Sequence, residues 1–340
     1  MSTFFSRSHR VARLVPAVLL ALAAALVAPP ASARSAPPGS LVHVGDSPYG
    51  VALTPDGRRA YVVATDPGTV AVVDTATGKA VGRVDVGPGA IDVAVTPDGR
   101  RAYVTSDTPS SLYGVVHVID TATDKKVGSI PVGEVPLGLA VTPDGRRVYV
   151  VDTWSSTVSV IDTASGRNIG RIRVGDDPGT GSPVDVAISP DGARAYVAIA
   201  GDGVPDSVAV IDTATGKVVG WPGRIGGYTC GLAVTPDGRS LYVTARESTV
   251  HVVDTATGKA VGAPIAVGQE ATDVAVSPDG RRAYVVNEIA QSVSVIDTAT
   301  RTVLDTIPVE DGPTRIALTP DGRHAYVTLY YSDAVRVLDL

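Results

Sequence analysis

The chain has 340 residues, of which 44% are hydrophobic and only 5% aromatic, and it carries a formal net charge of −6. A single cysteine, Cys230, excludes a disulfide framework, so stability must come from a large hydrophobic core. The abundance of Val, Thr, Gly and Pro favours short strands joined by tight turns, although length alone does not separate two average domains from one large all-β domain.

Residues 1–33 have the pattern of a cleaved secretory signal. Three arginines precede an apolar run at 14–27, and Ala31, Ser32 and Ala33 supply the small residues that a signal peptidase accepts. The alternative, a transmembrane anchor, needs about 20 apolar residues, and this run is shorter and contains Pro16. We therefore expect an exported protein, in the cell envelope or outside the cell, with a linker at 34–40 and no membrane-spanning segment in the mature chain.

The remainder of the chain, residues 41–340, consists of repeats. A T/S-P-D-G turn occurs seven times, and its aspartates follow one another at intervals of 42, 46, 47, 46, 42 and 42 residues. A tyrosine follows each of these aspartates by five residues and opens an apolar run, after which come a V-x-V-I/V-D segment and a fourth apolar run. The turn aspartates are Asp56, Asp98, Asp144, Asp191, Asp237, Asp279 and Asp321.

Four short strands in each period of this length are typical of a β-propeller blade. We name them a, b, c and d in chain order. The Asp-Gly and Thr-Gly pairs supply the positive φ that hairpin turns require, which explains Asp98 and its equivalents. The chain ends after strand c of the seventh repeat, and residues 41–45 resemble an isolated strand d. The sequence thus predicts a monomeric, all-β, seven-bladed propeller of four-stranded antiparallel blades, closed by the N-terminal strand.

The repeat resembles that of the bacterial YVTN-repeat, YncE-like, seven-bladed β-propellers. The closest matches are V-A-V-S-P-D-G-R-R-A-Y-V-V-N at 274–287 and T-V-S-V-I-D-T-A-S-G at 157–166. The resemblance covers nearly all of residues 41–340 and implies the fold, but the shared residues are those of turns and core. The asparagine of the motif is present only at Asn287, and the G-H and W-D signatures of WD repeats are absent.

The repeats differ mainly on one side of the predicted disc. The a–b and c–d turns, which form the face that we call the turn face, are nearly uniform. The b–c and d–a loops form the opposite face, the loop face, and contain insertions near residues 106–114, 175–183 and 198–207. These loops hold 18 acidic residues against only Arg246 and Arg315. Such a face attracts cations and disfavours nucleic acid, although carboxylates can also serve solubility alone.

Most aromatic residues outside the repeated tyrosine are predicted on or beside this loop face. They suit stacking on a cationic or sugar-like ligand, or anchoring of a protein partner, and local loop packing is the alternative. The six predicted ligand-binding aromatics are Tyr49, Tyr113, Trp154, Tyr228, Tyr330 and Tyr331.

One position just before strand a varies in a pattern. Across the seven blades it reads Gly50, Asp92, Gly138, Asp185, Gly231, Asp273 and Arg315. Placed at the channel mouth on the loop face, the three aspartates would raise one another's pKa unless a cation shared the space. A divalent cation such as Ca²⁺ is one interpretation, and capping of neighbouring amides by each carboxylate is the other.

Other candidate chemistry is sparse. Cys230 occupies a position that is Tyr, Ile, Leu, Val or Thr elsewhere, which predicts a buried side chain, and His117 and His251 lie at a variable position of strand c. Two hypotheses follow. The first is an exported binding or interaction scaffold that takes a cationic ligand, metal ion or protein on the loop face. The alternative is a metal-assisted lactonase- or lyase-like enzyme that uses Asp92, Asp185, Asp273 and Arg315. The absence of a recognisable base and nucleophile pair favours the first.

Overall fold

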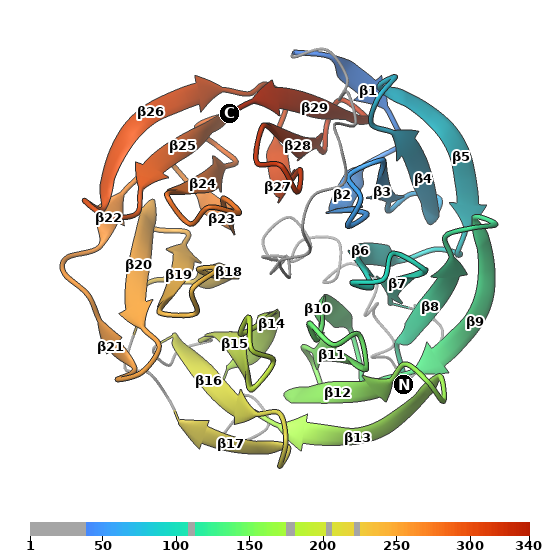
Figure 1. The fold of residues 1–340 in the computed structure, drawn as a ribbon, viewed down its shortest axis with the longest axis horizontal. Coiled ribbons are helices and arrows are strands. Elements are labelled where there is room, and N and C mark those ends of the chain that lie inside the picture. Colours follow the sequence, from blue (N-terminus) through green and yellow to red (C-terminus); the bar gives the residue numbers. More distant parts are fainter. Residues whose placement is uncertain (1–38, 108–112, 175–180, 202–205, 221–224) are drawn as a thin grey trace, which may run out of the picture.

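The computed structural model describes residues 39–107, 113–174, 181–201, 206–220 and 225–340. The predicted signal, most of the linker, Trp221 and much of the three insertions therefore lie outside the described residues. The described residues form seven antiparallel sheets arranged radially around a central axis (Figure 1). The prediction of an all-β, seven-bladed propeller is confirmed. No helix in this part of the chain is long and apolar enough to cross a membrane.

The strands follow one another outward from the axis in each blade. Blade 1 is β2 (Pro48–Leu53), β3 (Arg59–Ala64), β4 (Thr69–Asp74) and β5 (Lys79–Asp85); blade 2 is β6 (Ala90–Val95), β7 (Arg101–Ser106), β8 (Val115–Asp120) and β9 (Lys125–Pro131). Blade 3 is β10 (Pro136–Val141), β11 (Arg147–Asp152), β12 (Thr157–Asp162) and β13 (Arg167–Arg173); blade 4 is β14 (Ser182–Ile188), β15 (Arg194–Ala200), β16 (Ser207–Asp212) and β17 (Lys217–Gly220).

The last three blades include one exception to the regular pattern. Blade 5 is β18 (Thr229–Val234), β19 (Ser240–Ala245) and β20 (Thr249–Asp254), with its outer strand divided into β21 (Lys259–Ala260) and β22 (Ile265–Ala266). Blade 6 is β23 (Ala271–Val276), β24 (Arg282–Asn287), β25 (Ser292–Asp297) and β26 (Thr302–Pro308), and blade 7 is β27 (Pro313–Leu318), β28 (His324–Leu329) and β29 (Ala334–Asp339). The division in blade 5 falls at Gly262 and Pro264, and proline cannot donate to a strand ladder.

The N-terminal strand β1 (Leu41–His43) completes blade 7. It pairs antiparallel with β29, with Leu41 opposite Arg336 and His43 opposite Ala334, so the first and last strands of the described chain share one sheet (Figure 1). This pairing covers the edge that β29 would otherwise expose, as the sequence predicted.

The core lies between neighbouring blades. The three inner strands of each blade are largely buried on both sides, which explains their continuous Val, Ile and Ala runs. The repeated tyrosine is buried in all seven blades, with exposed fractions between 0% and 3%. The outer strands are mostly exposed, with one buried residue each in β5 and β9, because they form the rim of the disc.

The T-P-D-G turns connect the blades on the turn face. In blade 2 the Asp98 carboxylate accepts hydrogen bonds from the Thr96 hydroxyl and the Arg100 amide. Gly99 has φ +70°, and a Cβ there would lie 3.4 Å from Pro55 Cδ of blade 1. The same proline-to-glycine contact recurs around the disc and closes between Pro320 and Gly57. The turn aspartates are therefore architectural, and no function needs to be assigned to them.

Each outer strand except that of blade 5 and the short β1 carries a β-bulge. In β5, for example, Ala80 pairs with Val73 and Gly82 with Val72, so that Val81 is the extra, exposed residue. A bulge twists a sheet edge and hinders pairing with another strand. The equivalent exposed apolar residues are Val127, Ile169, Val219 and Leu304.

Candidate functional site

A second set of β-bulges lies in the innermost strands, at the position where the sequence alternates between Gly and Asp. We call these seven residues the mouth ring: Gly50, Asp92, Gly138, Asp185, Gly231, Asp273 and Arg315. In β6 the register shifts between Ala90 and Val93, and the other six innermost strands shift at the matching place. The ring thus lies within the strands and not before them, and a bulge re-aims side chains relative to a regular strand.

The three aspartates of the mouth ring each reach into the following blade. The Asp185 carboxylate accepts the Leu232 amide at 2.8 Å, and that of Asp273 accepts the Ile316 amide at 2.9 Å. Asp92 accepts the amide of Leu139 in the same way. Amide capping, one of the two interpretations open from the sequence, is therefore what the structure shows. The amides belong to neighbouring innermost strands and not to loops.

The alternation of Gly and Asp has a steric reason. A Cβ on Gly50 would lie 2.6 Å from Asp92 Cα and 2.5 Å from its Oδ1. A Cβ on Gly231 would lie 2.9 Å from Asp273 Cα. Contacts this short are not tolerated between real atoms, so a glycine precedes each of these aspartates in the ring.

Arg315 occupies the place where alternation cannot continue, because a ring of seven has an odd number of members. Its Nη1 lies 3.4 Å from Asp273 Oδ1, and both side chains are almost completely buried. On its other side, the guanidinium carbon lies 5.2 Å from the centre of the Tyr49 ring in blade 1. Arg315 therefore connects blades 6 and 1 by an ion pair and a cation–π contact.

Sequence reasoning missed a threonine that supports this ring. The Thr105 hydroxyl accepts the Asp92 amide at 3.1 Å and donates to the Leu137 carbonyl of the next blade at 2.8 Å. Thr328 accepts the Arg315 amide at 3.0 Å and donates to the Tyr49 carbonyl at 2.9 Å. The available signal was the Y-V-T sequence, which occurs in blades 2, 5 and 7.

The pKa values of the three aspartates are raised. Burial raises the pKa of Asp92 to about 6 and that of Asp185 to about 7, with Arg315 opposing both shifts. Burial also raises the pKa of Asp273 well above its usual range, again against the influence of Arg315. Repulsion between the carboxylates, which the sequence predicted as the main cause, is secondary, since desolvation comes first at each site.

The described structure gives no support to the calcium interpretation. No group of three or more His, Cys, Asp or Glu side chains in the described part of the chain is placed to hold a metal ion. The carboxylates of the mouth ring instead accept backbone amides from different blades.

The predicted aromatic residues fall into two groups. Tyr113, Trp154, Tyr228 and Tyr331 are exposed on the loop face by 54%, 41%, 56% and 69%. The prediction was wrong for Tyr49, which is only 3% exposed because it packs beneath Arg315. Tyr330 is half-buried and meets Tyr331 edge to face, with ring centres 5.3 Å apart. Ile289, exposed by 55%, is a loop-face residue that the search for aromatics overlooked.

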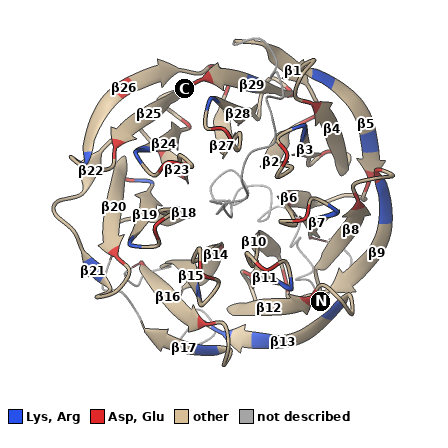
Figure 2. Cartoon of the chain, in the orientation of Figure 1, with Lys and Arg blue, Asp and Glu red and all other residues tan. Residues whose placement is uncertain are grey.

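Carboxylates outnumber basic groups on this face, and one aromatic residue, Tyr113, has a cation against it: the guanidinium carbon of Arg171 lies 5.6 Å from the centre of its ring. Arg246 pairs with Glu270 at 2.9 Å between blades 5 and 6. Burial, and then Glu270, raise the pKa of the neighbouring Glu288 to about 7. Arg336 pairs with Glu310 at 3.3 Å. Figure 2 shows other basic residues on the outer strands β5, β9 and β13, which lie away from the axis.

The remaining candidate groups are structural. Cys230 is buried, as predicted, and burial raises the pKa of its thiol to about 12, so it stays protonated. His117 Nδ1 lies 2.9 Å from Ser129 Oγ, and burial lowers the pKa of this imidazole to about 4. Asn287 Nδ2 donates to the hydroxyls of Ser292 and Ser294 and so connects strands b and c of blade 6.

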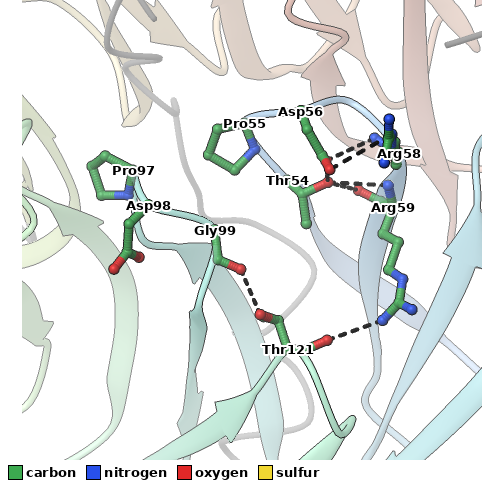
Figure 3. A pocket seen from close by; sticks show the side chains of 9 residues that line it. All are labelled: Thr54, Pro55, Asp56, Arg58, Arg59, Pro97, Asp98, Gly99 and Thr121. Carbon is green, nitrogen blue, oxygen red and sulfur yellow. Dashed lines mark hydrogen bonds and ion pairs between the residues drawn. The ribbon is translucent and has the colours of Figure 1, made fainter. Parts of the chain in front are cut away.

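A cavity of about 480 Å³ lies on the turn face between blades 1 and 2 (Figure 3). Its walls are repeated turn residues, and their polar groups are already engaged. Arg59 donates to the Thr121 carbonyl at 3.0 Å, and the Thr121 hydroxyl donates to the Gly99 carbonyl. The Thr54 hydroxyl donates to Asp56. We assign this cavity to the architecture of the turns.

Comparison with known proteins agrees with the fold. Residues 226–339, from just before β18 to the end of β29, match the family described as the cytochrome D1 heme domain. Among solved structures, Kuenenia stuttgartiensis hydrazine synthase is 24% identical, with a TM-score of 0.77 over 86% of this chain and 96% of that chain. No curated protein matches. The likeness establishes the fold. At this identity, and with a family match over about a third of the chain, it establishes neither family nor activity.

The described residues do not fit a haem at the mouth. Histidine, methionine, thiolate and tyrosinate can be axial ligands. On the innermost strands of the described chain they are represented by Cys230, whose thiol is protonated, and by Tyr49, which packs against Arg315. His324 lies at the turn-face end of β28, 2.9 Å from Asp339. Arg315, the one basic residue of the mouth ring, already faces Asp273 and so is not free to pair with a haem propionate. The match to the haem domain thus supports the fold alone.

Proposed function

We propose that this chain is an exported, YVTN-type binding propeller that holds a cationic ligand or protein partner on its loop face. One observation carries the proposal. Every exposed aromatic side chain among the described residues lies on the loop face, amid carboxylates that outnumber basic groups there. Exposed aromatic rings beside unpaired negative charge attract ammonium and guanidinium groups. The rim, by contrast, exposes isolated aliphatic residues at bulges, and these have an edge-protecting reason to be there.

The mouth ring supports this function as scaffold and not as a reactive centre. Its carboxylates cap amides, its arginine connects two blades, and its threonines bridge bulges. A rigid inner ring holds the loops in fixed positions, as a scaffold for binding loops requires. An enzymatic role for Asp92, Asp185, Asp273 and Arg315 has no supporting geometry in the described residues.

The proposal is tested by fluorescence anisotropy with fluorescein-labelled hexalysine, with labelled hexaglutamate as the charge control. Two fourfold variants with equal loss of charge are compared. The loop-face variant carries Asp46→Asn, Glu134→Gln, Glu247→Gln and Asp311→Asn. The matched control, on the rim and turn face, carries Asp74→Asn, Asp254→Asn, Asp297→Asn and Asp305→Asn.

Hexalysine is expected to bind the wild-type protein, to bind more weakly as salt rises, and to lose about tenfold in affinity only in the loop-face variant. Circular dichroism and thermal melts confirm that both variants fold. The proposal is overturned if wild type binds hexalysine no better than hexaglutamate, or if the two variants lose affinity equally.

A further inference from the structure

The loops of blades 6, 7 and 1 form one continuous surface. The Val309 amide donates to the Gln291 carbonyl at 2.8 Å, and the Tyr330 amide donates to the Gly312 carbonyl at 3.0 Å. The Val44 amide donates to the Asp333 carbonyl at 3.0 Å. Four successive loops, at 288–291, 309–312, 330–333 and 44–47, are thereby connected. We call this surface the acidic ridge.

The ridge carries two of the most exposed apolar side chains of the loop face. Ile289 is exposed by 55% and Tyr331 by 69%. Tyr331 is held in place, because its ring stands edge to face with Tyr330 and covers Gly312, where a Cβ would lie 2.5 Å from the ring. A fixed, exposed aromatic ring can contact a partner with little loss of conformational entropy.

The charges around these side chains are mainly negative. Asp46, Glu310 and Asp311 are exposed on the ridge, and Asp333 is half-buried. Arg336 faces Glu310, whose side chain is nevertheless 76% exposed. Asp311 accepts a hydrogen bond from the Ser332 hydroxyl, which fixes its carboxylate beside Tyr331 without neutralising it. A partner that covers the ridge must therefore bring positive charge as well as apolar contact.

We propose that the acidic ridge is the docking surface for a basic segment of another protein, in which lysine or arginine residues flank an apolar side chain. This inference rests on the proposed function of the loop face and names its partner. The ridge is long, extends over three blades and combines apolar and acidic groups. These features fit an extended peptide better than a single small cation, which would need one enclosed site.

The test compares the labelled peptide Lys-Lys-Leu-Lys-Lys-Leu with labelled hexalysine. The ridge variant carries Ile289→Ser and Tyr331→Ser, and the control variant carries Val127→Ser and Leu304→Ser at rim positions exposed by 60% and 56%. The leucine-containing peptide is expected to bind wild type and control several-fold more tightly than hexalysine does. The ridge variant should lose that difference. All four positions are exposed, and thermal melts verify folding.

The possible outcomes separate the two proposals. If the ridge variant binds the leucine-containing peptide as wild type does, while the fourfold loop-face variant loses it, the ridge proposal is wrong and the proposed function stands. If spermine displaces the peptide at equal concentration, the ligand is a small cation and the ridge proposal is again wrong. If wild type binds neither peptide in preference to hexaglutamate, both proposals fail.

Discussion

Asp273 and Arg315 form an ion pair across the boundary between blades 6 and 7, with Oδ1 and Nη1 3.4 Å apart and both side chains buried. The other carboxylate oxygen of Asp273 accepts the amide that directly follows Arg315 in the chain. At this boundary the Asp273 carboxylate therefore binds both the side chain of Arg315 and the backbone of the residue that follows it.

Loss of Arg315 should destabilise the fold strongly. Arg315→Ala leaves Asp273 buried without its cation, and removal of one partner of a buried ion pair typically costs about 3–5 kcal/mol. Arg336→Ala is the control, because its partner Glu310 is largely exposed, and we expect a cost below about 1 kcal/mol. Urea denaturation at pH 7 measures both changes. Equal effects of the two substitutions would contradict our conclusion that Arg315 stabilises the contacts between neighbouring blades.

The raised pKa values predict that stability declines from acid toward neutral pH. A carboxyl group whose pKa is higher in the folded than in the unfolded chain favours the folded state when protonated. That contribution is present below the unfolded value near 4 and is lost as pH rises through the folded value, about 6 for Asp92 and about 7 for Asp185. For Asp185 the loss is on the order of 4 kcal/mol.

The aspartates that end the c strands, such as Asp74, act in the opposite direction. Hydrogen bonds from Thr77 lower the pKa of Asp74, so its stabilising effect is lost as pH falls below the usual aspartate range. Melting temperature should therefore peak near pH 4–5. Asp185→Asn should flatten the decline between pH 5 and 8 and leave the acid side unchanged. A variant whose profile overlays that of wild type would show that Asp185 does not titrate in this window.

The steric origin of the Gly and Asp alternation is testable at Gly50. Gly50→Ala places a Cβ against the Asp92 backbone, and the required shift should cost roughly 1–3 kcal/mol. Gly170→Ala is the matched control, since a Cβ there would meet nothing within 4 Å. Thermal melts measure the loss of stability in each of the two variants relative to the wild-type protein. A Gly50→Ala protein as stable as the control would show that the ring has room to adjust.

The turn aspartates should affect stability and leave binding intact. Asp98→Ala removes the acceptor of the Thr96 hydroxyl and the Arg100 amide, at a cost of about 1 kcal/mol. Because Asp98 lies on the turn face, hexalysine affinity should stay within twofold of wild type. A large loss of affinity in this folded variant would show that hexalysine binds the turn face, which contradicts our proposal that it binds the loop face.

Haemin should not bind as an axially ligated cofactor. Titration of haemin into the protein, followed in the Soret region, is expected to give the spectrum of free haemin. Serum albumin serves as a positive control for the assay. A sharp, saturable Soret shift that Arg315→Ala abolishes would reverse our conclusion and make the mouth ring a haem site.

The sequence determined the architecture because the same turn and strand motifs occur in it seven times. Period, Asp-Gly turns and the unpaired terminal strand led to blade number, strand order and ring closure without any tertiary information. The sequence also marked Asp92, Asp185, Asp273 and Arg315 as exceptions to the repeat, since no turn rule required them.

Only the tertiary structure decided what those exceptions do. Whether Asp185 faces a shared cation or the amide of Leu232 depends on how two blades separated by 47 residues approach each other, and no local pattern encodes that distance. The burial of individual side chains could not be predicted from the sequence either. From the sequence, Tyr49 and Tyr331 were both predicted to be exposed loop-face aromatics. In the structure Arg315 covers Tyr49, whereas Tyr331 packs over Gly312 and is exposed to solvent. Exposure is a property of the assembled ring, because neighbouring blades and loops supply the atoms that exclude water.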